Sequence, residues 1–152
     1  CNSKPGQRWN MAWQFHKKIK PVKQAVIFKS SSGRCLGLAD GAAKNSGRTK
    51  IMLTKCSGKA DQAWTQYSNR TIRNAQNKHC LRIEDFGTKR VSEIYTEPCS
   101  QRTEALWVLK GDRILSAFDQ RCLDHRHVKG LVRAMACNGS KNKWKITPAP
   151  KM

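Results

Sequence analysis

Apolar residues along this chain form short segments, each followed by a cluster of Gly, Asn or Ser residues. The run Ala25-Val26-Ile27-Phe28, for example, precedes Ser30-Ser31-Ser32-Gly33, and no segment sustains the 3.6-residue period of a helix. Short apolar runs bounded by turn residues predict β-strands, and their spacing of roughly ten residues is typical of an all-β barrel or sandwich. We expect strands at residues 25–28, from 35, 50–54, 71–74, 80–83, 92–96, 113–115, 122–124 and 131–135.

One motif occurs three times along these segments: a Cys-Leu pair, a second cysteine and then a tryptophan. The three copies begin at Cys35, Cys80 and Cys122 and end at Trp64, Trp107 and Trp144. The tryptophans are 43 and 37 residues apart. A period near 40 residues with several strands in each unit fits a propeller or a threefold closure, but three blades are too few for a propeller. We therefore predict a β-trefoil, in which three units bury their Leu and Trp side chains around one pseudo-threefold axis.

The repeat divides the chain into an N-terminal arm and one domain. We place the arm at residues 1–24 and the trefoil at residues 25–152, with repeats at about 25–66, 67–109 and 110–148. A chain of 152 residues has the length of one domain and can bury a core of its own. Because Trp9 follows Cys1 at the distance at which Trp64 follows Cys56, the arm is also interpreted as the tail of a further, truncated repeat.

The charge of the chain predicts an anionic partner. It has 30 Lys and Arg residues against 10 Asp and Glu, a formal net charge of +20. The arm has no acidic residue and places tryptophans beside lysines. It either packs its aromatic side chains onto the domain or binds a membrane surface or polyanion. The candidate anion-binding residues are Lys17, Lys18, Lys20, Arg126, Lys129, Arg133, Lys141 and Lys143. No apolar run approaches the ~20 residues of a membrane-spanning helix.

Seven cysteines indicate a metal site, redox chemistry or disulfides. There is no Cys-x-x-Cys, and the four histidines are not spaced to complete a zinc site, so we expect neither a metal nor a cofactor. Pairing within each repeat predicts three disulfides: Cys35–Cys56, Cys80–Cys99 and Cys122–Cys137. Such bonds persist in an oxidising compartment, so we expect a secreted or lumenal protein. Glycosylation sequons at Asn69 and Asn138 agree with this location.

Cys1 lies outside this pairing scheme. It bonds to another chain or segment, caps a bacterial lipoprotein or remains free. No signal peptide precedes it, so we interpret the chain as a mature or processed form, or as a fragment.

No catalytic motif competes with a binding role. The chain has no Gly-x-Ser-x-Gly, no glycine-rich phosphate loop and no histidine pair at metal-ligand spacing on a helix. Its neighbouring acids, such as Asp119 near Asp124, are typical of solvated turns rather than of a glycosidase pair. We predict a binding module and not an enzyme.

The triplicated Cys-Leu-x, second Cys and terminal Gln-x-Trp resemble the ricin-type β-trefoil lectin domain over residues 25–148. The third copy is especially similar to the lectin domain that terminates polypeptide N-acetylgalactosaminyltransferases. This resemblance implies a galactose- or N-acetylgalactosamine-type lectin, or the receptor-binding subunit of a larger toxin or enzyme, whose partner is a glycan or glycoprotein.

The resemblance also locates the sugar-binding positions. In that family an Asp directly after Cys-Leu accepts hydrogen bonds from sugar hydroxyls, an aromatic residue two positions before the second Cys stacks on the sugar, and an Asn precedes Gln-x-Trp. The first repeat has Gly37 and Thr54 at the first two positions, and the second has Arg82 and Glu97. We expect neither repeat to bind galactose in the family's manner. The displaced substitutes are Asp40, Glu84 and Asp85.

The third repeat keeps Asp124 and carries the best predicted site. Met135 has the stacking position, Asn142 stands where Gln would, and His125 or His127 offers a ring. The candidate sugar-binding residues are Asp124, His125, His127, Met135 and Asn142. In the alternative hypothesis Asp124 caps a turn and the sugar sites have decayed. The basic scaffold then binds sulfated glycan, nucleic acid or anionic membrane, or assembles with another protein.

Overall fold

The structure is a computed structural model, and it describes residues 19–39, 48–84, 92–100, 102–125, 132–137 and 142–150. Most of the predicted basic arm therefore lies outside the described residues. So do several candidate residues: Cys1, Lys17, Lys18, Asp40, Asp85, Arg126, His127, Lys129, Asn138 and Lys141.

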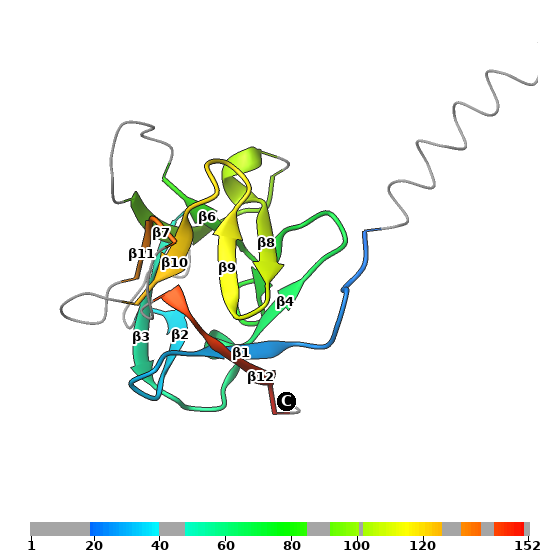
Figure 1. The fold of residues 1–152 in the computed structure, drawn as a ribbon. Helices are drawn as coiled ribbons and strands as arrows, with labels where there is room; N and C mark the ends of the chain where they lie inside the picture. Colours follow the sequence, from blue (N-terminus) through cyan, green and yellow to red (C-terminus); the bar gives the residue numbers. More distant parts are fainter. Residues whose placement is uncertain are drawn as a thin grey trace, which may run out of the picture.

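Each repeat contributes four short strands to the described part of the chain (Figure 1). The first repeat consists of β1 (Val26–Lys29), β2 (Arg34–Leu38), β3 (Thr49–Lys55), the 3-10 helix η1 (Ala60–Gln62) and β4 (Trp64–Gln66). The second consists of β5 (Ile72–Asn74), β6 (Cys80–Ile83), β7 (Ser92–Glu97), η2 (Thr103–Ala105) and β8 (Trp107–Lys110). The third consists of β9 (Arg113–Ser116), β10 (Cys122–Asp124), β11 (Arg133–Met135) and β12 (Lys145–Pro148). No described helix is long and apolar enough to cross a membrane.

The expected all-β class is confirmed, and each of the nine predicted strands has a counterpart. The fourth strand of each repeat, β4, β8 or β12, was not predicted. These strands are three or four residues long and lack a clear apolar alternation. They are fixed by pairing with strands distant in sequence, as when Val26 of β1 opposes both Trp64 and Pro148.

The strands form a closed ring and a cap. Antiparallel pairing joins β12 to β1, β1 to β4, β4 to β5 and β8 to β9. Two backbone hydrogen bonds complete the ring: the amide of Trp107 donates to the Arg70 carbonyl, and that of Trp144 to the Asp112 carbonyl, both at 2.8 Å. The hairpins β2–β3, β6–β7 and β10–β11 group together on the left in Figure 1 and are joined through β7. This arrangement is the predicted β-trefoil.

One interaction explains the triplicated motif. The indole nitrogen of each motif tryptophan donates a hydrogen bond to the carbonyl of the leucine in its own Cys-Leu pair. The three bonds are Trp64 to Leu36 at 2.9 Å, Trp107 to Leu81 at 2.8 Å and Trp144 to Leu123 at 3.0 Å. All six side chains lie in one buried core. In each repeat, this hydrogen bond therefore connects the second strand to the tryptophan that begins or immediately precedes the fourth strand.

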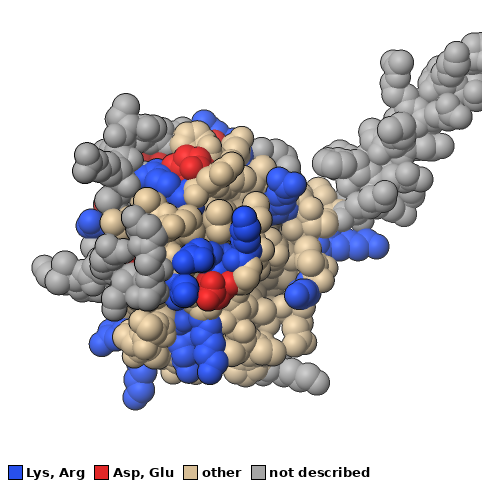
Figure 2. All heavy atoms as spheres, viewed as in Figure 1, with Lys and Arg blue, Asp and Glu red and all other residues tan. Residues whose placement is uncertain are grey.

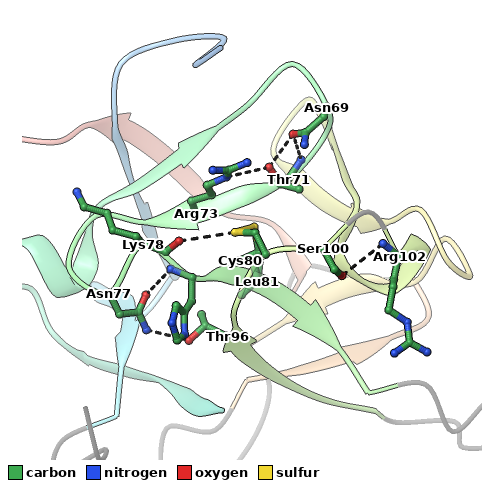
Figure 3. The surroundings of a disulfide bond; sticks show 12 residues. Asn69, Thr71, Arg73, Asn77, Lys78, Cys80, Leu81, Thr96, Ser100 and Arg102 are labelled. Carbon is green, nitrogen blue, oxygen red and sulfur yellow. Dashed lines mark hydrogen bonds between the residues drawn. A yellow bond between two sulfur atoms is a disulfide. The ribbon is translucent and has the colours of Figure 1, made fainter. Parts of the chain in front are cut away.

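The predicted disulfides form within the repeats, as Cys35–Cys56, Cys80–Cys99 and Cys122–Cys137. Polar side chains surround the second of them (Figure 3). There Asn77 donates to the Thr96 hydroxyl at 3.1 Å, and the Asn69 side-chain oxygen accepts from Thr71. The side-chain nitrogen of Asn69, the atom to which a glycan on this sequon would be attached, is buried.

Candidate functional site

Three positions in each repeat define the place where the resemblance locates a sugar. They are the residue after Cys-Leu, the residue two before the second cysteine and the residue three before the tryptophan. In the second repeat these are Arg82 on β6, Glu97 on β7 and Glu104 in η2. The structure brings all three together in the second repeat, whereas the last of these positions in the third repeat, Lys141, lies outside the described residues.

In the second repeat, ion pairs fill this region. The Arg82 guanidinium donates a hydrogen bond to the Glu97 carboxylate and lies 3.8 Å from a carboxylate oxygen of Glu104. These side chains are 8%, 17% and 10% exposed. Burial alone would lower the pKa of Arg82, but the Glu97 hydrogen bond and the neighbouring acidic groups raise it. The guanidinium and the two carboxylates therefore neutralise one another, although within the described residues the buried Nε atom of Arg82 has no hydrogen-bond partner.

Tyr95 extends the same cluster toward a cavity. The guanidinium of Arg48 lies 4.4 Å from the centre of its ring and 3.6 Å from Glu97. Burial raises the pKa of the Tyr95 phenol, against the opposing influence of Arg82 and Arg48. The cavity, of about 230 Å³, carries charges of both signs. Its lining residues are Arg48, Lys50, Ile51, Glu84, Glu93, Ile94, Tyr95, Val132 and Arg133.

In the first repeat, Gly37 leaves room for neighbouring side chains. A Cβ atom at this position would lie 2.7 Å from Cγ of Gln62 and 3.5 Å from a carboxylate oxygen of Asp61. Gln62 is held in place, because its side-chain amide donates to the Thr54 hydroxyl and the Lys55 carbonyl, both at 2.9 Å. The half-buried Asp61 thus brings a carboxylate beside the position where the family's Asp would stand.

Sequence reasoning missed Asp61 and Glu104. Each is the residue three before the motif tryptophan, where the family has Asn, and the acidic identity of both positions was the available signal.

In the third repeat, the retained acid is covered. Asp124 ends β10 opposite Arg133 of β11 and is 0% exposed. Met135, at the stacking position, is half-buried opposite Cys122. Because Asp124 is buried, a sugar hydroxyl can reach its carboxylate only if neighbouring parts of the protein move.

His125 and Asn142 contact the fold around this acid. The Nε2 atom of His125 lies 3.0 Å from the Lys143 carbonyl oxygen, and its ring meets the Trp144 ring edge-on at 5.0 Å. Asn142 is 0% exposed; its side-chain oxygen accepts from Nε of Arg113 at 2.8 Å and its nitrogen donates to the Ala136 carbonyl. Asn142 therefore has the same role as Gln62, which also bonds the carbonyl before the second cysteine.

The described candidates for anion binding lie on separate elements. Lys20 is exposed next to the β4–β5 turn, where its backbone amide bonds Ser68. Arg133 is half-buried on β11, and Lys143 is exposed just before β12. Within the described residues, no group of three or more His, Cys, Asp or Glu side chains is placed to hold a metal ion.

Comparison with known proteins places this geometry in a family. A family model described as "Ricin-type beta-trefoil lectin domain" matches residues 1–95. Comparison with curated protein sequences found no match.

Solved structures share the fold at low sequence identity. The trefoil lectin of the Vibrio vulnificus hemolysin/cytolysin, with N-acetyl-D-lactosamine bound, is 18% identical with a TM-score of 0.72, over 86% of this chain and 98% of that one. The C-terminal half of an earthworm R-type lectin, in complex with GalNAc, is 20% identical with a TM-score of 0.63, over 82% and 98%. GalNAc-T7 is 14% identical with a TM-score of 0.71, over 95% of this chain but 26% of that enzyme. With its family model matched and its triplicated fold in place, the chain belongs to the ricin-type beta-trefoil lectin domain family.

Proposed function

We propose that this chain is a secreted, non-catalytic carbohydrate-binding module that recognises galactose or N-acetylgalactosamine at the end of a glycan. Its family membership supports carbohydrate binding. Two proteins of the same fold are bound to N-acetyl-D-lactosamine and to GalNAc, respectively. The three disulfides support an oxidising compartment.

The observation that carries this proposal is the acid after Cys-Leu in the third repeat. Only this repeat has a carboxylate there, whereas the first has Gly37 and the second has Arg82 bonded to Glu97. In this proposal Asp124 accepts hydrogen bonds from two sugar hydroxyls, Met135 and His127 cover the apolar face of the sugar, and His125 and Asn142 hold the segment behind it. Because Asp124 is 0% exposed, binding includes a local movement of the groups that cover it.

The module serves a larger protein in this proposal, as a receptor-binding subunit of a toxin or an enzyme. The chain matches 31% of the hemolytic lectin CEL-III and 26% of GalNAc-T7, so domains of this fold occur as parts of longer chains. Cys1 is the candidate for a disulfide bond to another chain. Electrophoresis with and without reducing agent would detect such a bond.

Replacement of Asp124 by Asn tests the site. The intact protein is titrated with galactosides and N-acetylgalactosaminides by calorimetry, at low and at physiological salt. Asp124→Asn keeps the shape but removes the charge from the hydrogen bonds, so we expect affinity to fall about tenfold to a hundredfold, with little dependence on salt.

Asp61→Asn is the matched control, because it removes a carboxylate from the equivalent region of the first repeat. We expect this variant to bind as the intact protein does. If Asp61→Asn loses binding and Asp124→Asn does not, the third-repeat site is wrong. Absence of neutral-sugar binding in the intact protein contradicts the proposed function as a whole.

A further inference from the structure

The cavity beside Tyr95 lies where the third strands of the three repeats meet. β7 pairs with β6 along one edge and changes partner along the other. On this second edge, β3 pairs with Tyr95 and Thr96, and β11 pairs with Ser92 and Glu93. Neither described pairing includes Ile94, which lies between them and lines the cavity. Figure 1 shows β3, β7 and β11 together on the left. We call the cavity at this break in the pairing the axial cavity.

One apolar residue from each repeat lines the axial cavity. They are Ile51, Ile94 and Val132. Each stands two residues before the strand partner of its repeat's motif leucine, so the three positions are equivalent. All three belong to the buried core. Because equivalent residues of the three repeats meet at the pseudo-threefold axis, the axial cavity lies on that axis and belongs to no single repeat.

The charged residues of the lining share the outer face of these strands. Lys50 is directly opposite Tyr95, and Arg133 is directly opposite Glu93. Directly opposite residues share a face of a sheet, and so do residues two apart on one strand. Glu93 and Tyr95 are two apart on β7, so all four side chains lie on one face, and the exposure of Lys50 and Glu93 makes it the outer one. Glu84 continues the register beside Glu93, because its amide donates to the Glu93 carbonyl at 3.0 Å.

Four of these charges form no ion pair in the part of the chain that the structure describes. They are Lys50, Glu84, Glu93 and Arg133. Arg48, the remaining charged residue of the lining, does form one. The core requires the apolar residues of the lining, but the described fold does not use these four charges in ion pairs. Two cations and two carboxylates are therefore available to a ligand.

The size and chemistry of the axial cavity define that ligand. Its volume of about 230 Å³ lies below the ~300–1,000 Å³ of sites for drug-sized molecules, so it suits one small polar unit. Cations bind a carboxylate through charge-assisted hydrogen bonds, and carboxylates accept hydrogen bonds from hydroxyl groups. Figure 2 shows a surface whose charged side chains are mostly basic, and the formal net charge of +20 favours an anionic ligand at long range.

We propose that the axial cavity binds a single sugar unit that carries a carboxylate, such as a uronic acid or a sialic acid. The sugar carboxylate meets Lys50 and Arg133, the sugar hydroxyls donate to Glu84 and Glu93, and the C–H groups of the ring lie against Ile94. The choice of a sugar rests on the proposed function. The site itself does not, because it is formed by three repeats together and lies apart from the position after Cys-Leu in each.

Titration of the isotope-labelled protein with small probes, followed by the amide signals in nuclear magnetic resonance spectra, locates and measures binding. The acidic probes are the methyl glycosides of glucuronic acid and N-acetylneuraminic acid. Methyl glucoside, which has a hydroxymethyl group in place of the carboxylate of the glucuronide, and acetate, which lacks the sugar, are the controls. We expect saturable shifts at Ile94 and Tyr95, with affinity for an acidic sugar at least about tenfold higher than for either control. Binding of one acidic probe and not the other identifies the sugar.

Two substitutions test the charged residues separately. Lys50→Gln should weaken binding of the acidic sugar about tenfold, because it removes a cation from the carboxylate. Glu93→Gln should weaken it about fivefold, because a neutral amide is a poorer acceptor for hydroxyls. If charge attraction alone held the ligand, Glu93→Gln would strengthen binding instead. Arg133 is left unchanged, because it also lies opposite Asp124.

Lys55→Gln and Asp112→Asn are the matched controls. They change the net charge as Lys50→Gln and Glu93→Gln do, respectively, at exposed positions outside the lining. Both should bind within about twofold of the intact protein at physiological salt. Asp124→Asn should also keep the acidic sugar, and Lys50→Gln should keep galactoside binding, so failure of this site and failure of the proposed function are distinguishable. Circular dichroism and thermal melting confirm that each variant is folded.

Four results would overturn the proposal. The first is the absence of saturable shifts at Ile94 and Tyr95 with either acidic probe. The second is equal affinity for an acidic sugar and for methyl glucoside or acetate. The third is tighter binding of the acidic sugar by Glu93→Gln. The fourth is an equal loss of affinity in Lys50→Gln and Lys55→Gln, which would indicate net charge alone.

Discussion

At the scale of single residues, two arginines that share partners show how burial determines the contribution of a charged side chain to the stability of the fold. Arg82 and Arg48 both lie near the Glu97 carboxylate and the Tyr95 ring. The Arg82 side chain is 8% exposed and that of Arg48 is 61% exposed. Water screens the second interaction and not the first, so the two side chains stabilise the fold to very different degrees.

We expect Arg82→Met to lower the free energy of unfolding by about 3–5 kcal/mol, because it leaves the carboxylates of Glu97 and Glu104 with their buried partner removed. Arg48→Met should change it by no more than about 1 kcal/mol. Urea denaturation of both variants at neutral pH provides the measurement. Equal effects of the two substitutions would show that the buried pair is not a stabilising element of the second repeat.

At the same scale, only part of the candidate site could be predicted from the sequence. It identified the positions after Cys-Leu, because they are adjacent to the motif. It did not foresee that Asp124 is fully covered or that His125 lies against the Lys143 carbonyl, which is 18 residues further along the chain. Contacts of this kind depend on how the last strand returns to the sheet, and a local pattern of residue types does not record that return.

At the scale of elements, strand prediction succeeded where apolar residues cluster and failed where pairing alone holds a strand. β3 has alternate residues buried, so its sequence carries a clear signal. β12 has no fully buried residue, and its four residues pair with all four residues of β1. The sequence of β12 therefore lacks the pattern, although the strand completes the ring.

The pairing of β1 with β12 also predicts a stabilising substitution. Lys145→Glu places an acid directly opposite Lys29 and converts repulsion into attraction, so we expect the free energy of unfolding to rise by about 0.2–1 kcal/mol. Lys145→Gln, which only removes the repulsion, should give a smaller rise. Thermal melting at low salt measures both, and a Glu variant no more stable than the Gln variant would show that the two side chains do not interact.

At the scale of the whole molecule, the trefoil could be predicted because its threefold pattern is written in the sequence. Three Cys-Leu pairs and three tryptophans at a period near 40 residues leave few folds that bury them all, and the structure places the leucine and tryptophan side chains in one core. The disulfides are local, each within one repeat. Cohesion between repeats therefore depends on the shared core and on the strand pairs that join one repeat to the next.

This dependence predicts the effect of removing the last strand. Deletion of residues 145–152 removes β12 and its four pairs with β1 and opens the ring, although Trp144 and the three disulfides of the described residues remain. We expect the near-ultraviolet circular dichroism of the tryptophans to collapse throughout the domain and the cooperative thermal transition to disappear, because the core of one repeat is also the core of the others. A synthetic peptide of residues 145–152, added in excess, should restore part of the signal. If the truncated chain instead keeps a cooperative transition close to that of the intact protein, the repeats are independent units, and closure of the ring by β12 is not what holds them together.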